Sequence, residues 1–153
     1  MSYSVAFLVS KLLNLFYGGI VSFTPHNYSL SMGGFQVQIY EPCSGIEGIT
    51  LFIFVYLAYL LVDWSVVRKV RALCIGLSGI LIMYGANVLR IYLIMVLGFE
   101  VFERMGAAAA YTLVVRYFHG HVGWFLYGTV ILLYVTFSRR FIMRSGAIKT
   151  HAA

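Results

Sequence analysis

The sequence predicts an all-α polytopic membrane protein with about four transmembrane helices and a short extracytoplasmic β-hairpin before the second helix. Of its 153 residues, 61% are hydrophobic and only 10% are charged, whereas a soluble domain carries about a quarter charged residues. The basic residues form short clusters between long apolar runs. The net charge of +6 therefore indicates membrane orientation and not nucleic-acid binding. We expect a single membrane domain over residues 1–153, embedded in the cell membrane.

The first predicted span covers residues 4–23, an apolar run long enough to cross a bilayer at about 1.5 Å per residue. Lys11 lies within this run, and its side chain can reach toward the nearer surface. A helix lying in the membrane interface is the alternative. The segment lacks the basic start and small-residue cleavage site of a signal peptide, so we expect it to be retained.

Residues 24–43 are expected outside the membrane as a β-hairpin. Between Asn27 and Tyr40, apolar and polar residues alternate on both sides of the pair Gly33-Gly34. Such alternation around a two-residue glycine turn is typical of a hairpin with one apolar face. A structured loop is the alternative. The predicted facing pairs are Met32 with Phe35, Leu30 with Val37 and Tyr28 with Ile39.

The remaining apolar runs predict three more spans, at residues 44–62, 72–95 and 122–137. The basic segments 63–71 and 138–153 are expected on the cytoplasmic side, because cytoplasmic loops carry an excess of Lys and Arg. Residues 99–121 contain several charges and predict an extracytoplasmic interfacial helix and loop after a bend near Gly98.

Cys43 is the first candidate functional residue. It stands directly after Pro42, where the hairpin segment leads into the second apolar run, and proline favours a helix start. A thiol at a helix N-terminus is favoured as thiolate by the helix dipole. The alternative is a small buried cysteine. Cys74 would lie at the opposite membrane surface, beyond the reach of a disulfide with Cys43.

Helix lengths bring Cys43, Arg90 and His119 to one membrane level. Each lies about 27–30 Å of helix from a predicted cytoplasmic segment. A thiol, a guanidinium and an imidazole are the groups needed for acyl transfer through a thioester. Separately, an arginine can snorkel and a histidine can contact lipid headgroups. His119-Gly120-His121 has no obvious carboxylate partner for a metal site, so we expect no metal and no other cofactor.

Two further polar residues are candidates for a supporting role. Asn87 precedes Arg90 by three positions, so both lie on one helical face. Glu47 lies one predicted helical turn from Cys43, where a carboxylate is costly. It could orient His119 or pair with Arg90, and the sequence leaves its role open.

Three motifs resemble those of the exosortase and archaeosortase family of membrane transpeptidases. They are Cys43-Ser44-Gly45-Ile46, Asn87-Val88-Leu89-Arg90-Ile91 and Phe118-His119-Gly120-His121-Val122-Gly123-Trp124. The three motifs occur in the same order as in the family, and the resemblance covers the chain from about residue 35 to 135. The resemblance implies that Cys43 is the nucleophile, His119 the acid/base and Arg90 the stabilising cation.

The resemblance also implies a partner and a site of action. The substrate would be the C-terminal tail of a secreted protein, with a short sorting motif, a membrane helix and a basic end. The acyl group would pass to a lipid or another cell-surface acceptor on the extracytoplasmic face of the plasma membrane. We expect no nucleic-acid partner. The chain is shorter than the larger family members, which carry extra N-terminal spans.

Other classes of function remain open at this point. The main alternative is a non-enzymatic membrane subunit with a structural Arg90–Glu47 pair and an inert Cys43. A thiol oxidoreductase would need a second thiol from a partner protein. A small transporter is disfavoured because the polar groups gather at one surface and form no path through the bilayer.

Overall fold

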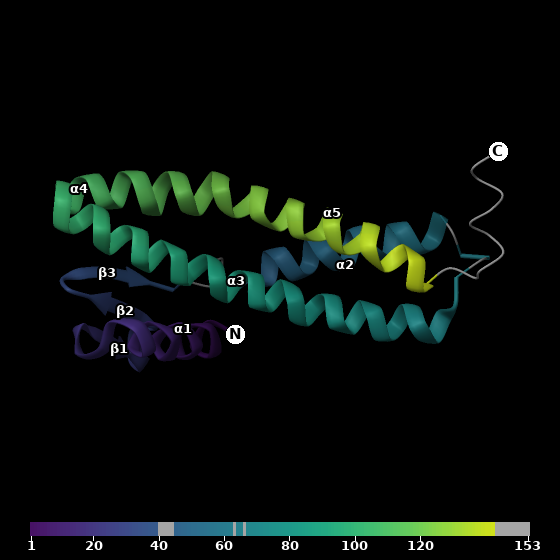
Figure 1. Cartoon of the computed structure of the whole chain (residues 1–153), viewed down its shortest axis with the longest axis horizontal. Helices are drawn as coiled ribbons and strands as arrows, with labels where there is room; N and C mark the ends of the chain where they lie inside the picture. Colours follow the sequence, from purple (N-terminus) through teal and green to yellow (C-terminus); the bar gives the residue numbers. More distant parts are fainter. Residues whose placement is uncertain (40–44, 63, 66, 143–153) are drawn as a thin grey trace.

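The computed structural model describes residues 1–39, 45–62, 64–65 and 67–142, without the side chains of Val115, Phe118, His119 and Val122. The described chain is mainly helical, and its helices surround one long central helix (Figure 1). In chain order the elements are α1 (Ser2–Tyr17), η1 (Gly18–Ile20), β1 (Val21–Thr24), η2 (Pro25–Asn27), β2 (Ser29–Met32), β3 (Phe35–Gln38), α2 (Ile46–Val62), α3 (Lys69–Met105), α4 (Ala107–Ala110), η4 (Tyr111–Val122) and α5 (Gly123–Ile142).

Helix α3 organises the molecule. Its 37 residues extend about 55 Å, well beyond the hydrocarbon thickness of about 30 Å. Helices α2 and α5 pack beside its N-terminal half, while α1 and the three strands pack beside its C-terminal half (Figure 1). The protein therefore has two parts joined by α3. We call them the bundle (residues 46–87 and 123–142) and the head (residues 1–39 and 88–114).

The bundle has an apolar core and an apolar outer surface. Phe52 and Tyr56 of α2 pack against Ile131 of α5 in this core, and Gly79 of α3 leaves room for the Phe52 ring. On the outside, Phe54 is 73% exposed and Phe125 is 80% exposed. Large apolar side chains on both sides of a helix are expected where lipid replaces water. These features make the chain a membrane protein.

Three helical segments in the described chain are long and apolar enough to cross a membrane. They are Ser2–Ile20, Lys69–Met105 and Gly123–Ile142. The apolar helix α2 has 17 residues, or about 26 Å, which is slightly less than the thickness of the hydrocarbon core. The fourth span therefore remains a prediction.

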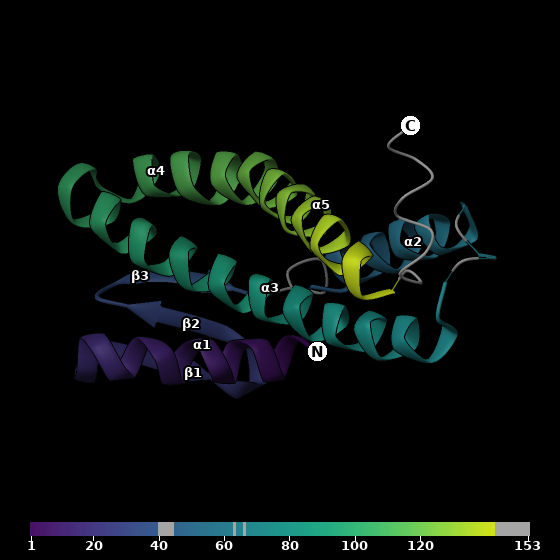
Figure 2. The ribbon, with the colours of Figure 1, turned by 45° about the vertical axis from the view of Figure 1, so that its right-hand side comes forward.

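The head is built around an antiparallel sheet of order β1-β2-β3. Its strands β2 and β3 lie between α1 and α3 in the turned view (Figure 2). Leu30 pairs with Val37 and Met32 with Phe35, the register that the alternating pattern predicts. The turn residues Gly33 and Gly34 have φ of 56° and 96°, as a tight two-residue hairpin turn requires. The backbone N–H of Ile39 also donates to the Tyr28 carbonyl at 3.0 Å.

The first predicted span is too long. Helix α1 ends at Tyr17, and Gly18 follows with φ of 57°. Residues 21–23 of the predicted span instead belong to β1, which continues to Thr24 and pairs with β2. Their alternating exposure explains the difference, since Val21 and Phe23 face the head core while Ser22 and Thr24 face away. Helix α1 packs on the C-terminal half of α3 and not beside α2.

The predicted bend near Gly98 is also wrong. Helix α3 continues to Met105, and Gly98 lies on the face that receives the Phe35 ring of β3. The charges of this segment sit at the exposed helix end, where Arg104 pairs with Glu100 at 3.1 Å. The chain then turns at Gly106 and returns through α4 and η4 to α5. Residues 99–121, for which the sequence predicts an interfacial helix and a loop, are therefore largely helical.

Replacing Gly98 by alanine tests how the head packs on α3. Alanine is favoured over glycine in a helix by up to about 1 kcal/mol, but here its methyl group would overlap the buried Phe35 ring, and overpacking costs about 1–3 kcal/mol. Gly85 lies in the same helix with nothing within 4 Å of an added Cβ. We expect G98A to lower the midpoint of thermal unfolding in detergent and G85A to raise it slightly. Equal shifts in both variants would contradict the described packing.

Candidate active site

A buried polar network lies where the bundle meets the head. Asn87 and Arg90 of α3 are 0% and 4% exposed, and Tyr127 of α5 is 2% exposed. The Tyr127 hydroxyl donates to Asn87 Oδ1 at 2.7 Å and accepts from Arg90 Nη1 at 3.0 Å. One hydroxyl thus joins both polar residues of α3, and its two roles agree with the donor and acceptor capacity of a phenol.

The Tyr127 ring also contacts the Arg90 cation. Arg90 Cζ lies 5.3 Å from the ring centroid, within the range of a cation–π interaction. A guanidinium remains charged inside proteins and needs hydrogen-bond acceptors when it is buried. The ring and the hydroxyl together fix the orientation of this cation before any ligand is present.

The start of α2 packs closely on this network through two glycines. A Cβ on Gly45 would lie 2.8 Å from Asn87 Nδ2, and a Cβ on Gly48 would lie 2.9 Å from Tyr127 Cζ. Gly45 also has φ of 87°, a conformation that other residues rarely adopt. These two positions therefore let the chain just after residue 44 approach Asn87 and Tyr127.

The start of α5 approaches the network from another side. A Cβ on Gly123 would lie 2.6 Å from Arg90 Nε, so a larger residue would displace the guanidinium. Gly123 directly follows η4, a π-helix of 12 residues. Such helices are rare and usually limited to one turn at functional sites. The polar network is thus enclosed by α3 and the first turns of α2 and α5.

The structure brings together some of the residues predicted from the sequence. Asn87 and Arg90 lie in one network. Cys43 lies outside the described residues, and the first described residue after it is Gly45. The backbone of His119 belongs to η4, but its side chain is not described.

Glu47 does not take the predicted place beside the other polar residues. Glu47 lies in the first turn of helix α2, which begins at Ile46, and Cys43 lies outside the described residues. Gly48 faces the bundle, which turns the neighbouring Glu47 outward. Its side chain is exposed, and within the described chain it forms no ion pair with Arg90. The structural Arg90–Glu47 pair is therefore wrong.

Glu47 instead lines an open groove of about 490 Å³ on the outer surface of α2. Trp124 of α5 forms the other side of the groove. Along α2 the lining changes from polar to apolar, because Thr50 is followed by Leu51 and Phe54. The groove runs beside Gly48 and Gly123, the residues that pack on the buried network.

Tyr127 is the residue that sequence reasoning missed. It lies in the apolar run predicted as the last span, among several other tyrosines and phenylalanines. A buried tyrosine hydroxyl needs a hydrogen-bond partner, which is the only signal the sequence offered. Nothing in the sequence singled out this tyrosine from the others.

The chain matches the family described as transmembrane exosortase (Exosortase_EpsH) over residues 1–136. The matched range covers the positions of Cys43, Asn87, Arg90 and His119. In the comparisons with curated proteins and with solved structures, none matches the chain.

Replacing Tyr127 by phenylalanine tests the network directly. The ring is kept, but Asn87 Oδ1 loses the hydrogen bond that Tyr127 donates. Removing one partner of a buried hydrogen bond costs about 1–3 kcal/mol. Tyr84 of α3 is half-buried, and its hydroxyl makes no hydrogen bond within the described structure. In equilibrium unfolding we expect Y127F to be clearly destabilised and Y84F to stay within about 0.5 kcal/mol of wild type. Similar losses in both would argue against the network.

Proposed function

The chain belongs to the transmembrane exosortase family, and we propose that it is a cysteine-dependent membrane transpeptidase. In this proposal it cleaves the C-terminal sorting signal of secreted proteins through a Cys43 thioester and transfers them to a cell-surface or lipid acceptor. The observation that carries the proposal is the fixed, buried Arg90 cation in the Asn87–Tyr127–Arg90 network. The packing of two glycines from the family motifs on that network adds support.

In the first step the Cys43 thiolate attacks the carbonyl carbon of the scissile peptide bond. The carbonyl oxygen becomes an oxyanion, which Arg90 stabilises. When this intermediate collapses, the C–N bond breaks and a thioester remains on Cys43. The leaving amine takes a proton from the His119 imidazolium, which acts as general acid.

In the second step an acceptor with a nucleophilic amine or hydroxyl attacks the thioester carbonyl. His119 takes the proton of the attacking group as general base. The C–S bond then breaks, and Cys43 leaves as a thiolate. Attack by water instead would complete a hydrolysis by the same sequence of bond changes.

Chain connectivity supports the convergence of the three groups. Gly45 follows Cys43 by two residues and packs on Asn87, while Gly123 follows His119 by four residues and packs on Arg90. Two residues of extended chain cover at most about 7 Å, and four cover about 14 Å. In the sequence, Cys43 and His119 therefore lie within a few residues of glycines that pack on the Asn87–Tyr127–Arg90 network.

Asn87 and Tyr127 act as positioning residues in this mechanism. Neither needs to touch the reacting atoms, because their hydrogen bonds and the Tyr127 ring hold the Arg90 guanidinium in place. A cation that is already oriented stabilises developing charge without reorganisation during the reaction. This role explains why polar groups are buried at such a cost within an apolar protein.

Cys43 reactivity gives a test that needs no identified substrate. A membrane-impermeant maleimide is added outside whole cells, in a Cys74→Ser background because Cys74 is an exposed free cysteine. We expect rapid labelling well below pH of about 8.5, the ordinary thiol pKa. The pH profile should shift upward in R90A and H119A, because each removes a group proposed to favour the thiolate. G123A should act in the same direction, since its methyl group displaces Arg90.

Gly128 supplies the matched control for Gly123. It lies in the same helix, and nothing lies within 4 Å of an added Cβ, so G128A should keep the wild-type profile. Slow labelling with an ordinary pH profile in wild type would favour a non-enzymatic subunit. An absence of labelling at any pH would contradict an outward-facing Cys43.

The sheet offers a place for the extended sorting motif. β3 lies at the sheet edge and precedes Cys43 in the sequence, and an extended peptide can add to such an edge by backbone hydrogen bonds. The Ile39 N–H points to β2, so in the alternation of an antiparallel ladder the Gln36 N–H points away from β2. Gln36 is therefore available for pairing with an added strand.

Proline at Gln36 tests this recognition. Q36P removes an outward N–H without removing a β2–β3 hydrogen bond, whereas Q36A keeps the N–H. Mass spectrometry of secreted proteins in the native host should reveal uncleaved C-terminal tails with Q36P and normal cleavage with Q36A. Cys43 labelling should be unchanged in both. Normal cleavage with Q36P would exclude edge pairing while leaving the catalytic proposal intact.

A further inference from the structure

The end of the bundle opposite the head contains an open hollow of about 820 Å³. Its described lining comes from residues 64, 65 and 67–71, at and just before the start of α3. Trp64 and Ser65 line one part of it, and Arg68, Lys69 and Arg71 line the other. The catalytic proposal uses none of these residues.

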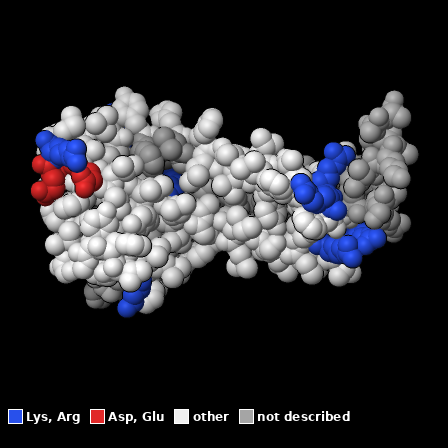
Figure 3. Space-filling view, in the orientation of Figure 1, with Lys and Arg blue, Asp and Glu red and all other residues white. Residues whose placement is uncertain are grey.

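Basic side chains from two distant segments gather at this end of the molecule. Arg139 and Arg140 lie in the last turn of α5, and the Arg68 N–H donates to the Ile142 carbonyl at 3.1 Å. This hydrogen bond holds the end of α5 against the start of α3. Figure 3 shows Lys and Arg side chains at this end and all visible Asp and Glu side chains at the opposite end. Among the described residues, the charged side chains at this end of the molecule are all basic.

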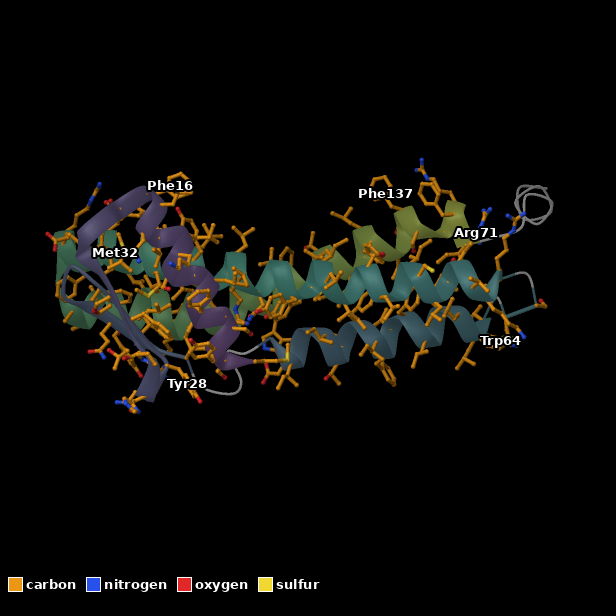
Figure 4. All side chains as sticks on the ribbon, turned by 90° about the horizontal axis from the view of Figure 1, so that it is seen from below. Phe16, Tyr28, Met32, Trp64, Arg71 and Phe137 are labelled. Atoms are coloured by element: carbon orange, nitrogen blue, oxygen red, sulfur yellow. The ribbon has the colours of Figure 1, made fainter. Side chains whose placement is uncertain are left out.

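An aromatic residue and apolar side chains border the cations. Lys69 Nζ lies 5.0 Å from the Trp64 ring centroid, and Trp64 and Arg71 occupy the same end of the molecule (Figure 4). Val70 and Leu73 are exposed beside them and continue into the apolar outer surface of α3. Tryptophan beside basic residues at the end of an apolar helix is typical of the membrane interface. A soluble polyanion bound to these cations would leave the neighbouring apolar side chains exposed to water, whereas a lipid would cover them.

We propose that the hollow lined by Trp64, Arg68, Lys69 and Arg71 binds the phosphate headgroup of an anionic phospholipid. The cations and the N-terminal N–H groups of α3 attract the phosphate. Trp64, Val70 and Leu73 contact the glycerol and the upper acyl chains. The site is independent of the transpeptidase chemistry and anchors the loop between α2 and α3 at one membrane surface.

Trp64 itself reports on the site, because the chain has two tryptophans and a W124F variant keeps only Trp64. The protein is reconstituted in phosphatidylcholine bilayers that contain a small fraction of lipid brominated near the headgroup. We expect brominated phosphatidylglycerol to quench Trp64 fluorescence at a several-fold lower mole fraction than brominated phosphatidylcholine. The preference should vanish in R68Q/K69Q/R71Q, since each cation near an anionic surface contributes about fivefold.

Lys11, at the other end of the molecule, provides the control, and K11Q should keep the preference. If the triple variant fails to insert, the wild-type protein gives the same test in about 1 M salt. There the screening length falls to about 3 Å, and the preference should largely disappear. Equal quenching by the two lipids would overturn the proposal, as would a preference that persists in the triple variant. Competition by millimolar inorganic phosphate would also overturn it, in favour of a free-anion site.

Discussion

The hydroxyl of Tyr127 is the point on which the functional part of the structure depends. It donates to Asn87 and accepts from Arg90, so one oxygen joins two buried polar residues on successive turns of α3. Such groups are expensive to bury in an apolar protein unless they have hydrogen-bond partners. The network therefore fixes the rotation of α5 relative to α3. Because Gly123 begins α5, the same rotation brings η4 toward Arg90.

The length of α3 explains how a membrane bundle and a folded head can share one small chain. The bundle core ends near Met83, and the head core begins at Val88. Asn87 and Arg90 lie between an apolar environment on one side and the sheet on the other. A rigid helix through both parts holds the head at a fixed distance from the basic end. Gly45, Gly48 and Gly123 allow the starts of α2 and α5 to approach the network closely, and Gly98 allows β3 to pack on α3.

Charged residues are distributed unevenly along the direction of α3, and this distribution indicates the orientation of the protein in the membrane. The basic residues around Arg68 and Arg139 mark one end, while the Glu100–Arg104 pair marks the other. Arg90 differs from these residues because it is buried, and it donates to the Tyr127 hydroxyl. Under the positive-inside rule the basic end would face the cytoplasm. The network and the head would then lie toward the outer surface, as the proposed processing of secreted proteins requires.

The sequence by itself determined the class of protein, the candidate motifs and the hairpin register. These follow from local signals, namely apolar runs, short motifs and a period of two around Gly33-Gly34. Only the tertiary structure decided that residues 21–24 form a strand, because short apolar runs fit helix and strand alike. It also decided that α3 continues past Gly98, that Glu47 faces outward and that Tyr127 joins Asn87 to Arg90. Each of these depends on which side chain from a distant segment fills the adjacent space, and periodicity within one segment carries no information about that.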